Sequence, residues 1–155
     1  MSFQITALSP KPFASFFQDA GAPDAAPFAQ IHVADGNAGM PCRVSLEDAK
    51  AGERVLLINH THQPHETPFR ASHAVYVREG AAQAHPAPGE VPAVFLSRQV
   101  AIRAFDAAHM MVSAEVVPGA DLAQHLPLVL ADPQIAYLQL HYAAQGCFAA
   151  QVTRG

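Results

Sequence analysis

The stretch IAYLQLHYAAQGCFAAQVT, residues Ile135–Thr153, contains two alternating segments and decides the expected fold. Successive side chains of a strand point to opposite faces, so the pattern predicts strands over Ile135–His141 and Cys147–Thr153. A one-residue slip would turn every side chain over, and a Tyr142–Gly146 loop gives the register that keeps one face apolar. The apolar pairs in this register are Leu140 with Phe148, Leu138 with Ala150, and Ala136 with Val152.

The same register places His141 directly across from Cys147, on the less apolar face of the hairpin. A thiol close to an imidazole and a guanidinium can ionise, so the pair predicts a nucleophile or a redox-responsive group. The structural alternative is a buried cysteine that packs as a small hydrophobe. The hairpin itself lacks the Asp or Asn that would orient the imidazole in a catalytic triad.

A second hairpin is predicted from Ser97–Phe105 and Met110–Val117, with Ile102 opposite Val112. In this register Arg103 lies on the less apolar face. If both hairpins belong to one sheet with these faces aligned, Arg103 shares a surface with the histidine and the cysteine of the C-terminal hairpin.

The rest of the chain adds short elements joined by turns. Strands are predicted over Phe3–Leu8, Phe28–Val33, Arg54–Asn59 and Ala74–Arg78, and helices over Pro12–Asp19 and Asp121–Ala131. Strands joined by hairpins, with helices inserted rather than alternating, indicate an α+β fold. We expect a single domain over residues 1–155, with a mainly antiparallel sheet and two or three short helices.

Composition excludes several classes of function. Only 14% of the residues are charged and the net charge is −4, so no basic surface for nucleic acid or an anionic membrane is expected. The two cysteines, Cys42 and Cys147, form no CxxC motif, which favours a reducing cytoplasm. No apolar run in the sequence is long enough to predict a membrane span.

Three arginines beside turns or strand ends, Arg43, Arg70 and Arg103, are candidates for binding a small anion. Planar guanidinium groups bind carboxylate or phosphate through two parallel hydrogen bonds. The structural alternative for Arg103 is an ordinary ion pair with Asp106 or Glu115, which would contribute little to stability.

A cluster of four residues after the strand Arg54–Asn59 could bind zinc or iron. Its members are His60, His62, His65 and Glu66. The His-x-His-x-x-x-Glu spacing resembles a cupin metal motif, although His73 stands where the closing glycine of that motif belongs. Solvated loop histidines are the alternative interpretation.

Short segments in a fixed order form a further pattern: PCRVSL (41–46), GERVLL (52–57), HQP (62–64), PFR (68–70), VRE (77–79), RAFD (103–106), and His141 with GCFA (146–149). From about residue 30 to 154, the chain resembles the uncharacterised bacterial family called domain of unknown function 1203. The resemblance implies a shared polar set at Cys42, Arg43, His62, Arg70, Arg103, Asp106, His141 and Cys147, and it supplies no reaction. The chain departs from the family pattern at His60, His65 and His73.

The leading hypothesis is a cytoplasmic protein that binds a small anionic molecule, and whether it is an enzyme stays open. Arg70 and Arg103 would hold the anion, His62 and His141 would move protons, and Cys147 would be the nucleophile, with Arg43, Cys42 and Asp106 completing the pocket. The alternatives are a non-catalytic binding or interaction module and a histidine-ligated metal protein. We expect no other cofactor, and the oligomeric state stays open.

Overall fold

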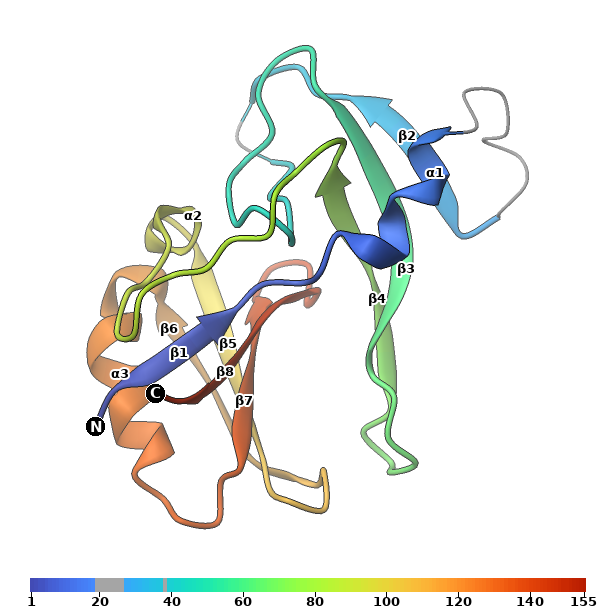
Figure 1. Ribbon diagram of the computed structural model, residues 1–155. Helices are drawn as coiled ribbons and strands as arrows, with labels where there is room; N and C mark the ends of the chain where they lie inside the picture. Colours follow the sequence, from blue (N-terminus) through green and yellow to red (C-terminus); the bar gives the residue numbers. More distant parts are fainter. Residues whose placement is uncertain (19–26, 38) are drawn as a thin grey trace.

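The computed structural model describes residues 1–18, 27–37 and 39–155, whose strands form two antiparallel sheets (Figure 1). The five-stranded sheet has the order β1 (Phe3–Thr6), β8 (Phe148–Arg154), β7 (Tyr137–Tyr142), β5 (Gln99–Phe105) and β6 (Met111–Pro118). The three-stranded sheet has the order β2 (Ala29–Val33), β3 (Arg54–Gln63) and β4 (Ala71–Arg78). All of these strand pairs are antiparallel.

Three short α-helices and two 3₁₀ turns complete the described elements, and together with the strands they confirm the α+β prediction. They are α1 (Ser15–Gln18), α2 (Ala93–Leu96), α3 (Leu122–Leu130), η1 (Lys11–Phe13) and η2 (Gly119–Asp121). The predicted end of the first helix, Asp19, lies outside the described residues. None of the helices in the described ranges is long and apolar enough to cross a membrane.

Helix α3 covers the apolar face of the five-stranded sheet. Its Leu122, Leu126 and Leu130 are fully buried because their spacing places them on one side of the helix. They pack against alternate residues of β5, β7 and β8, among them Ile102 and Leu140. Side-chain alternation therefore leaves the other residues of these strands on the opposite face, which carries polar groups.

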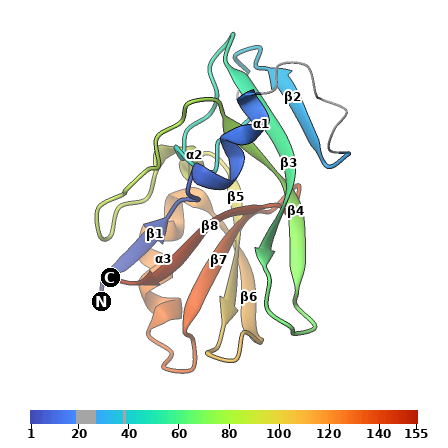
Figure 2. The same ribbon diagram turned by 45° about the vertical axis from the view of Figure 1, so that its right-hand side comes forward.

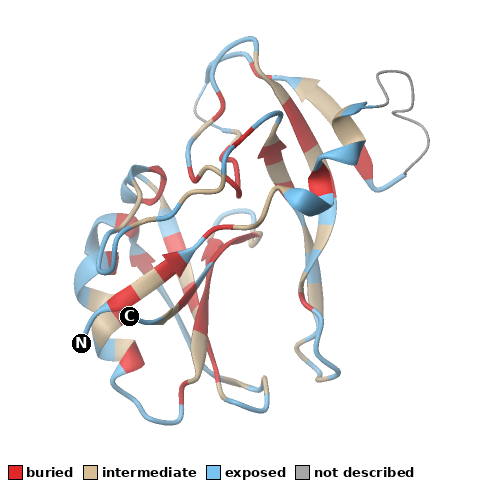
Figure 3. Ribbon diagram, in the orientation of Figure 1, coloured by how far each residue is buried: buried red, intermediate tan, exposed pale blue. Residues whose placement is uncertain are grey.

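The β3–β4 hairpin extends across this polar face, beside β7 (Figures 1 and 2). Its tip, which includes Pro64, His65 and Arg70, is exposed, whereas the centres of β7 and β8 are buried (Figure 3). Strand β3 continues through Gln63 instead of ending at Asn59 as predicted. The histidines expected on a loop are therefore partly in a strand, where neighbours point to opposite faces.

The predicted registers of both hairpins are wrong, because the strands pair differently next to each turn and one β-bulge in each hairpin adds a further one-residue shift. Strand β7 pairs Leu138 with Val152 and then, after a bulge, His141 with Phe148 instead of Cys147. The two-residue shift at Leu138 preserves which side chains share a face, so alternation alone cannot detect it.

In the other hairpin, Ile102 pairs with Glu115 instead of Val112. Strand β6 is an edge strand exposed on both faces, so its apolar pattern carries little information about register.

Gly119 provides a test of the packing between α2 and η2. A Cβ atom built on Gly119 would lie 1.7 Å from the carbonyl oxygen of Phe95 and 2.9 Å from that of Arg98. Gly119→Ala should therefore lower the free energy of unfolding by about 3 kcal/mol, measured by urea denaturation. Gly39→Ala is the control, because a Cβ there meets nothing within 4 Å. Equal effects of the two substitutions would contradict this packing.

Candidate functional site

The polar face of the five-stranded sheet carries three polar side chains side by side. Arg103 of β5 pairs with Gln139 of β7, and His141 lies two residues farther along β7 on the same face. The β3–β4 hairpin brings His62 and His73 against these residues. The site therefore joins the two sheets.

Three histidine rings, from β3, β4 and β7, pack together at this junction. The His62 and His73 rings are stacked with centroids 4.8 Å apart, and His62 Nε2 lies 2.8 Å from His73 Nδ1. The His141 ring meets them edge-on, at 5.0 Å and 5.6 Å. On its other side, His62 stacks on Phe148 at 5.1 Å, so its ring is held between two aromatic neighbours. One nitrogen from each histidine lies within 4.8 Å of the other two.

Gln139 connects the histidines through its buried amide. Its Nε2 donates to the backbone carbonyl of His62 at 3.1 Å, which sets the orientation of the amide. The Oε1 atom consequently faces His62 Nδ1 at 2.8 Å and His141 Nε2 at 3.1 Å. The other nitrogen of His141, Nδ1, faces the carbonyl oxygen of Gly146 at 3.1 Å.

Burial keeps these imidazoles neutral at neutral pH. It lowers the pKa of His62 to about 4 and that of His141 to about 3, and the positive charge of Arg103 adds to both shifts. Burial and then Arg103 also lower the pKa of His73. Neutral imidazole has one N–H donor and one lone pair, so each ring can donate one hydrogen bond and offer one nitrogen as a ligand.

Arg103 is the cation of this site. Its guanidinium makes no hydrogen bond or ion pair with any residue in the described part of the chain, and partial burial lowers its pKa. Asp106 is not its partner, because the Oδ1 atom of Asp106 accepts hydrogen bonds from the backbone amides of Ala108 and Met110 at 2.9 Å. Asp106 thus stabilises the β5–β6 turn.

Cys147 belongs to a second polar group, centred on Arg43. The guanidinium of Arg43 is 1% exposed and donates to the carbonyl of Phe148 at 2.7 Å, to the carbonyl of Pro41, and to Cys147 Sγ at 3.0 Å. It also lies 4.8 Å from the ring centre of Tyr142. A cavity of about 190 Å³, whose lining includes Cys147, opens beside it.

The structure therefore corrects the predicted cross-strand pair of His141 and Cys147. The sulfur of Cys147 faces Arg43, whereas the nitrogens of His141 face Gln139 and Gly146. The bulge between Leu140 and His141 separates the two groups.

Other predicted site residues lie elsewhere. Arg70 and Glu66 are exposed at the hairpin tip, and buried Cys42 accepts hydrogen bonds from the backbone amides of Ser45 and Arg78. His60 packs edge-on against Phe13, and His65 stacks on His109. The predicted metal set therefore contributes only His62 to the histidine cluster.

Sequence reasoning missed His73 and Gln139 as members of the site. The register of β3 and β4 pairs His60 with His73 and shifts near His62, between Thr61 and Gln63. A longer predicted hairpin would have placed His73 beside the β3 histidines. The alternation of Tyr137, Gln139 and His141 on one face was the available signal for Gln139.

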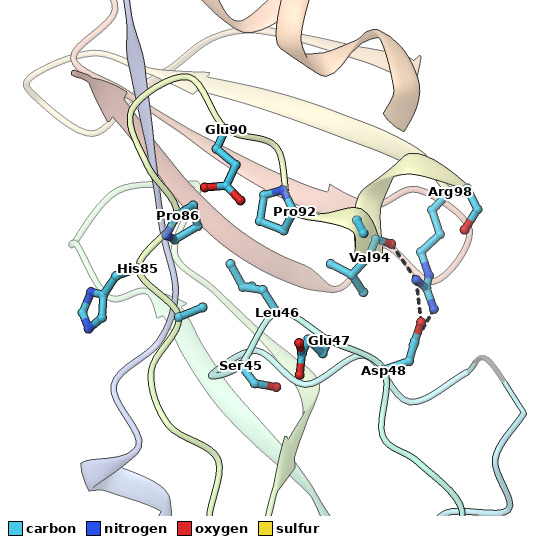
Figure 4. A pocket seen from close by; sticks show the side chains of 13 residues that line it. Ser45, Leu46, Glu47, Asp48, His85, Pro86, Glu90, Pro92, Val94 and Arg98 are labelled. Atoms are coloured by element: carbon cyan, nitrogen blue, oxygen red, sulfur yellow. Dashed lines mark hydrogen bonds and ion pairs between the residues drawn. The ribbon is translucent and has the colours of Figure 1, made fainter.

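A cavity of about 500 Å³ lies elsewhere in the described part of the chain (Figure 4). Three of its charged groups have partners within the protein: Arg98 binds Asp48 at 2.7 Å and 3.1 Å, and Glu90 accepts from the Ala87 amide at 2.7 Å. The buried hydroxyl of Ser45 has no hydrogen-bond partner among the described residues. The arginine of this cavity is therefore already paired with a carboxylate.

The depressed histidine pKa values predict acid sensitivity. Below about pH 6.5 His62 and His141 become protonated in the unfolded chain, whereas the folded protein keeps both neutral until about pH 4. The free energy of unfolding should therefore fall as the pH is lowered from 6.5 to 4. For the buried His141, the slope approaches about 1.4 kcal/mol per pH unit.

Urea denaturation in chelator-containing buffers measures this dependence. His141→Gln should reduce the slope, and His85→Gln, at an exposed position, should leave it unchanged. Stability that does not change between pH 6.5 and 5 would contradict the buried neutral state of His141.

The two thiols should differ in reactivity. Cys42 is 1% exposed, whereas Cys147 is partly exposed and accepts a hydrogen bond from Arg43. Iodoacetamide should modify Cys147 at least about tenfold faster at pH 7, since local opening that costs about 1.4 kcal/mol already slows Cys42 tenfold. Mass spectrometry of tryptic peptides measures both rates, and Cys147→Ala should abolish the fast phase. Equal, slow modification of both thiols would refute the difference.

Comparison with known proteins gives a family and no activity. The family described as "Protein of unknown function (DUF1203)" matches residues 39–154, which are most of the chain and include all members of the histidine cluster. No curated protein and no solved structure matches the chain. The chain with this two-sheet fold and histidine cluster therefore belongs to the DUF1203 family.

Proposed function

We propose that the protein binds a small anionic molecule on the polar face of the five-stranded sheet, with Arg103 as the principal anion-binding group. The observation that carries this proposal is the partly buried guanidinium of Arg103, which has no hydrogen-bond or ion-pair partner among residues 1–18, 27–37 and 39–155. A guanidinium removed from part of its water gains most from an oxyanion that can accept two parallel hydrogen bonds.

A groove lined by Gln139, the cross-strand partner of Arg103, provides the space for a ligand. Its volume of about 330 Å³ suits a small molecule. The groove is lined by His62, Gln63, Pro64, His65, His109, Tyr137, Gln139 and Gln151. This lining contains no carboxylate, and Gln139 lies directly opposite Arg103 in the sheet. Hydroxyl, amide and imidazole groups in the groove, with an arginine on the neighbouring strand, favour a polar, negatively charged ligand.

The proposed site keeps Arg103 and His62 of the predicted pocket, adds Gln139, and leaves the other predicted members out. Arg70 is exposed at the hairpin tip, and Cys147 hydrogen bonds with Arg43 instead of His141. We therefore place the anion with Arg103, His62 and Gln139, and we assign no reaction to the site. The competing interpretation is a structural cluster, in which Arg103 only stabilises the fold.

Substitution of Arg103 tests the proposal against this structural interpretation. Thermal shift and calorimetric titration with phosphate, oxalate and malonate, in a chelator-containing buffer, should identify at least one anion that binds the wild-type protein. Arg103→Gln should weaken binding of that anion by about 10- to 100-fold, the loss of charged hydrogen bonds.

Arg70→Gln is the matched control, because Arg70 is an exposed arginine at the tip of the β3–β4 hairpin and lies outside the proposed site. It should bind the anion as the wild type does. The proposal fails if none of the three anions binds, or if Arg103→Gln lowers the Tm without weakening anion binding.

A further inference from the structure

We propose that His62, His73 and His141 together bind one divalent transition-metal ion, and that the anion held by Arg103 completes the coordination of this ion. The metal site stands on the histidines alone, whereas the role of the anion rests on the function proposed above. The ligand is thereby narrowed to a small molecule with a carboxylate or phosphate oxygen that can bind the metal.

The distances between the imidazole nitrogens suit such an ion. A tetrahedral ion with Zn–N bonds of about 2.0–2.1 Å separates its ligand nitrogens by about 3.4 Å. His62 Nε2 and His73 Nδ1 are 2.8 Å apart, and one nitrogen of each of the three histidines lies within 4.8 Å of the others. The required separation falls between these values, so small side-chain rotations suffice.

The hydrogen bonds of His141 give an independent reason for a cation. Both of its ring nitrogens face oxygen atoms, Nδ1 the carbonyl of Gly146 and Nε2 the Oε1 atom of Gln139, each at 3.1 Å. A neutral imidazole has only one N–H, so one of these two contacts brings a lone pair against an oxygen. Burial and Arg103 oppose the doubly protonated ring that would satisfy both. A metal ion bound to Nε2 would remove the repulsion.

The surrounding acceptors match those of metal-bound histidines. Such histidines usually donate their second ring N–H to a backbone carbonyl or a similar oxygen, which orients the ring. His141 Nδ1 faces the carbonyl of Gly146, and His62 Nδ1 faces the Oε1 atom of Gln139. Each of these two rings thus has an oxygen acceptor on Nδ1 and offers Nε2 to a metal.

The charge of Arg103 explains why an anion belongs to the site. Arg103 acts on all three histidines, because its positive charge lowers the pKa of each. The same charge repels a divalent cation, and a bound oxyanion between the two positive groups would offset this repulsion. Three imidazole ligands also leave a coordination position open for that oxyanion.

Metal titration of the full chain without a histidine tag tests the inference. After treatment with EDTA and dialysis, the wild type should bind one Zn²⁺ per chain in calorimetry, and Co²⁺ should give a visible absorption spectrum with nitrogen ligation. His73→Ala should weaken Zn²⁺ binding at least about tenfold. His85→Ala is the control, since His85 is exposed and lies outside both the histidine cluster and the groove.

His62→Gln is the second variant, in case His73→Ala fails to fold, and it should lose the same metal affinity. The inference is overturned if the wild type binds no stoichiometric Zn²⁺. It is also overturned if a folded His73→Ala or His62→Gln protein binds Zn²⁺ as tightly as the wild type, or if His85→Ala loses the site.

Addition of the anion to the Co²⁺ protein separates the two proposals. The anion should change the Co²⁺ spectrum of the wild type, and Arg103→Gln should keep Co²⁺ but lose this change. Anion binding in EDTA without any Zn²⁺ binding would leave the proposed function intact and refute the metal. Stoichiometric Zn²⁺ without binding of any anion would refute the proposed function and the role of the anion, and leave the metal site.

Discussion

The arrangement of the two sheets and of the site depends on the hydrogen bonds of the buried Gln139 amide. Its N–H group binds the backbone of His62 in the three-stranded sheet, while its oxygen faces the rings of His62 and His141. A buried amide without partners would cost about 1–3 kcal/mol, so packing of the β3–β4 hairpin must satisfy it. The same contact that joins the sheets therefore also orients the histidines.

The sequence predicts the secondary structure better than it predicts the pairing. Alternation identifies the strands and correctly places Arg103 and His141 on one face, and the spacing of Leu122, Leu126 and Leu130 identifies α3. Pairing registers depend on turns and bulges, and a shift by two residues leaves the alternation of faces unchanged. His60 was mispredicted as a loop residue because β3 extends to Gln63. The cross-strand partner of Val112 was mispredicted because β6 is an exposed edge strand.

The candidate site was predictable only in part because its members come from two sheets. His62 and His141 are separated along the chain and meet through tertiary packing, which no local pattern specifies. His73 enters the cluster because β4 begins at Ala71, three residues before its predicted start. Cys147 lies close to His141 in the sequence of the hairpin, yet its sulfur accepts a hydrogen bond from Arg43, which is distant in sequence.

The division of the histidine cluster between the two sheets has a mechanical consequence. His62 and His73 move with the three-stranded sheet, whereas His141 moves with the five-stranded sheet. Any ligand that engages all three rings at once acts as a non-covalent cross-link between these sheets. Its binding energy then resists their separation, by about 2.7 kcal/mol when the ligand is present at a hundred times its Kd.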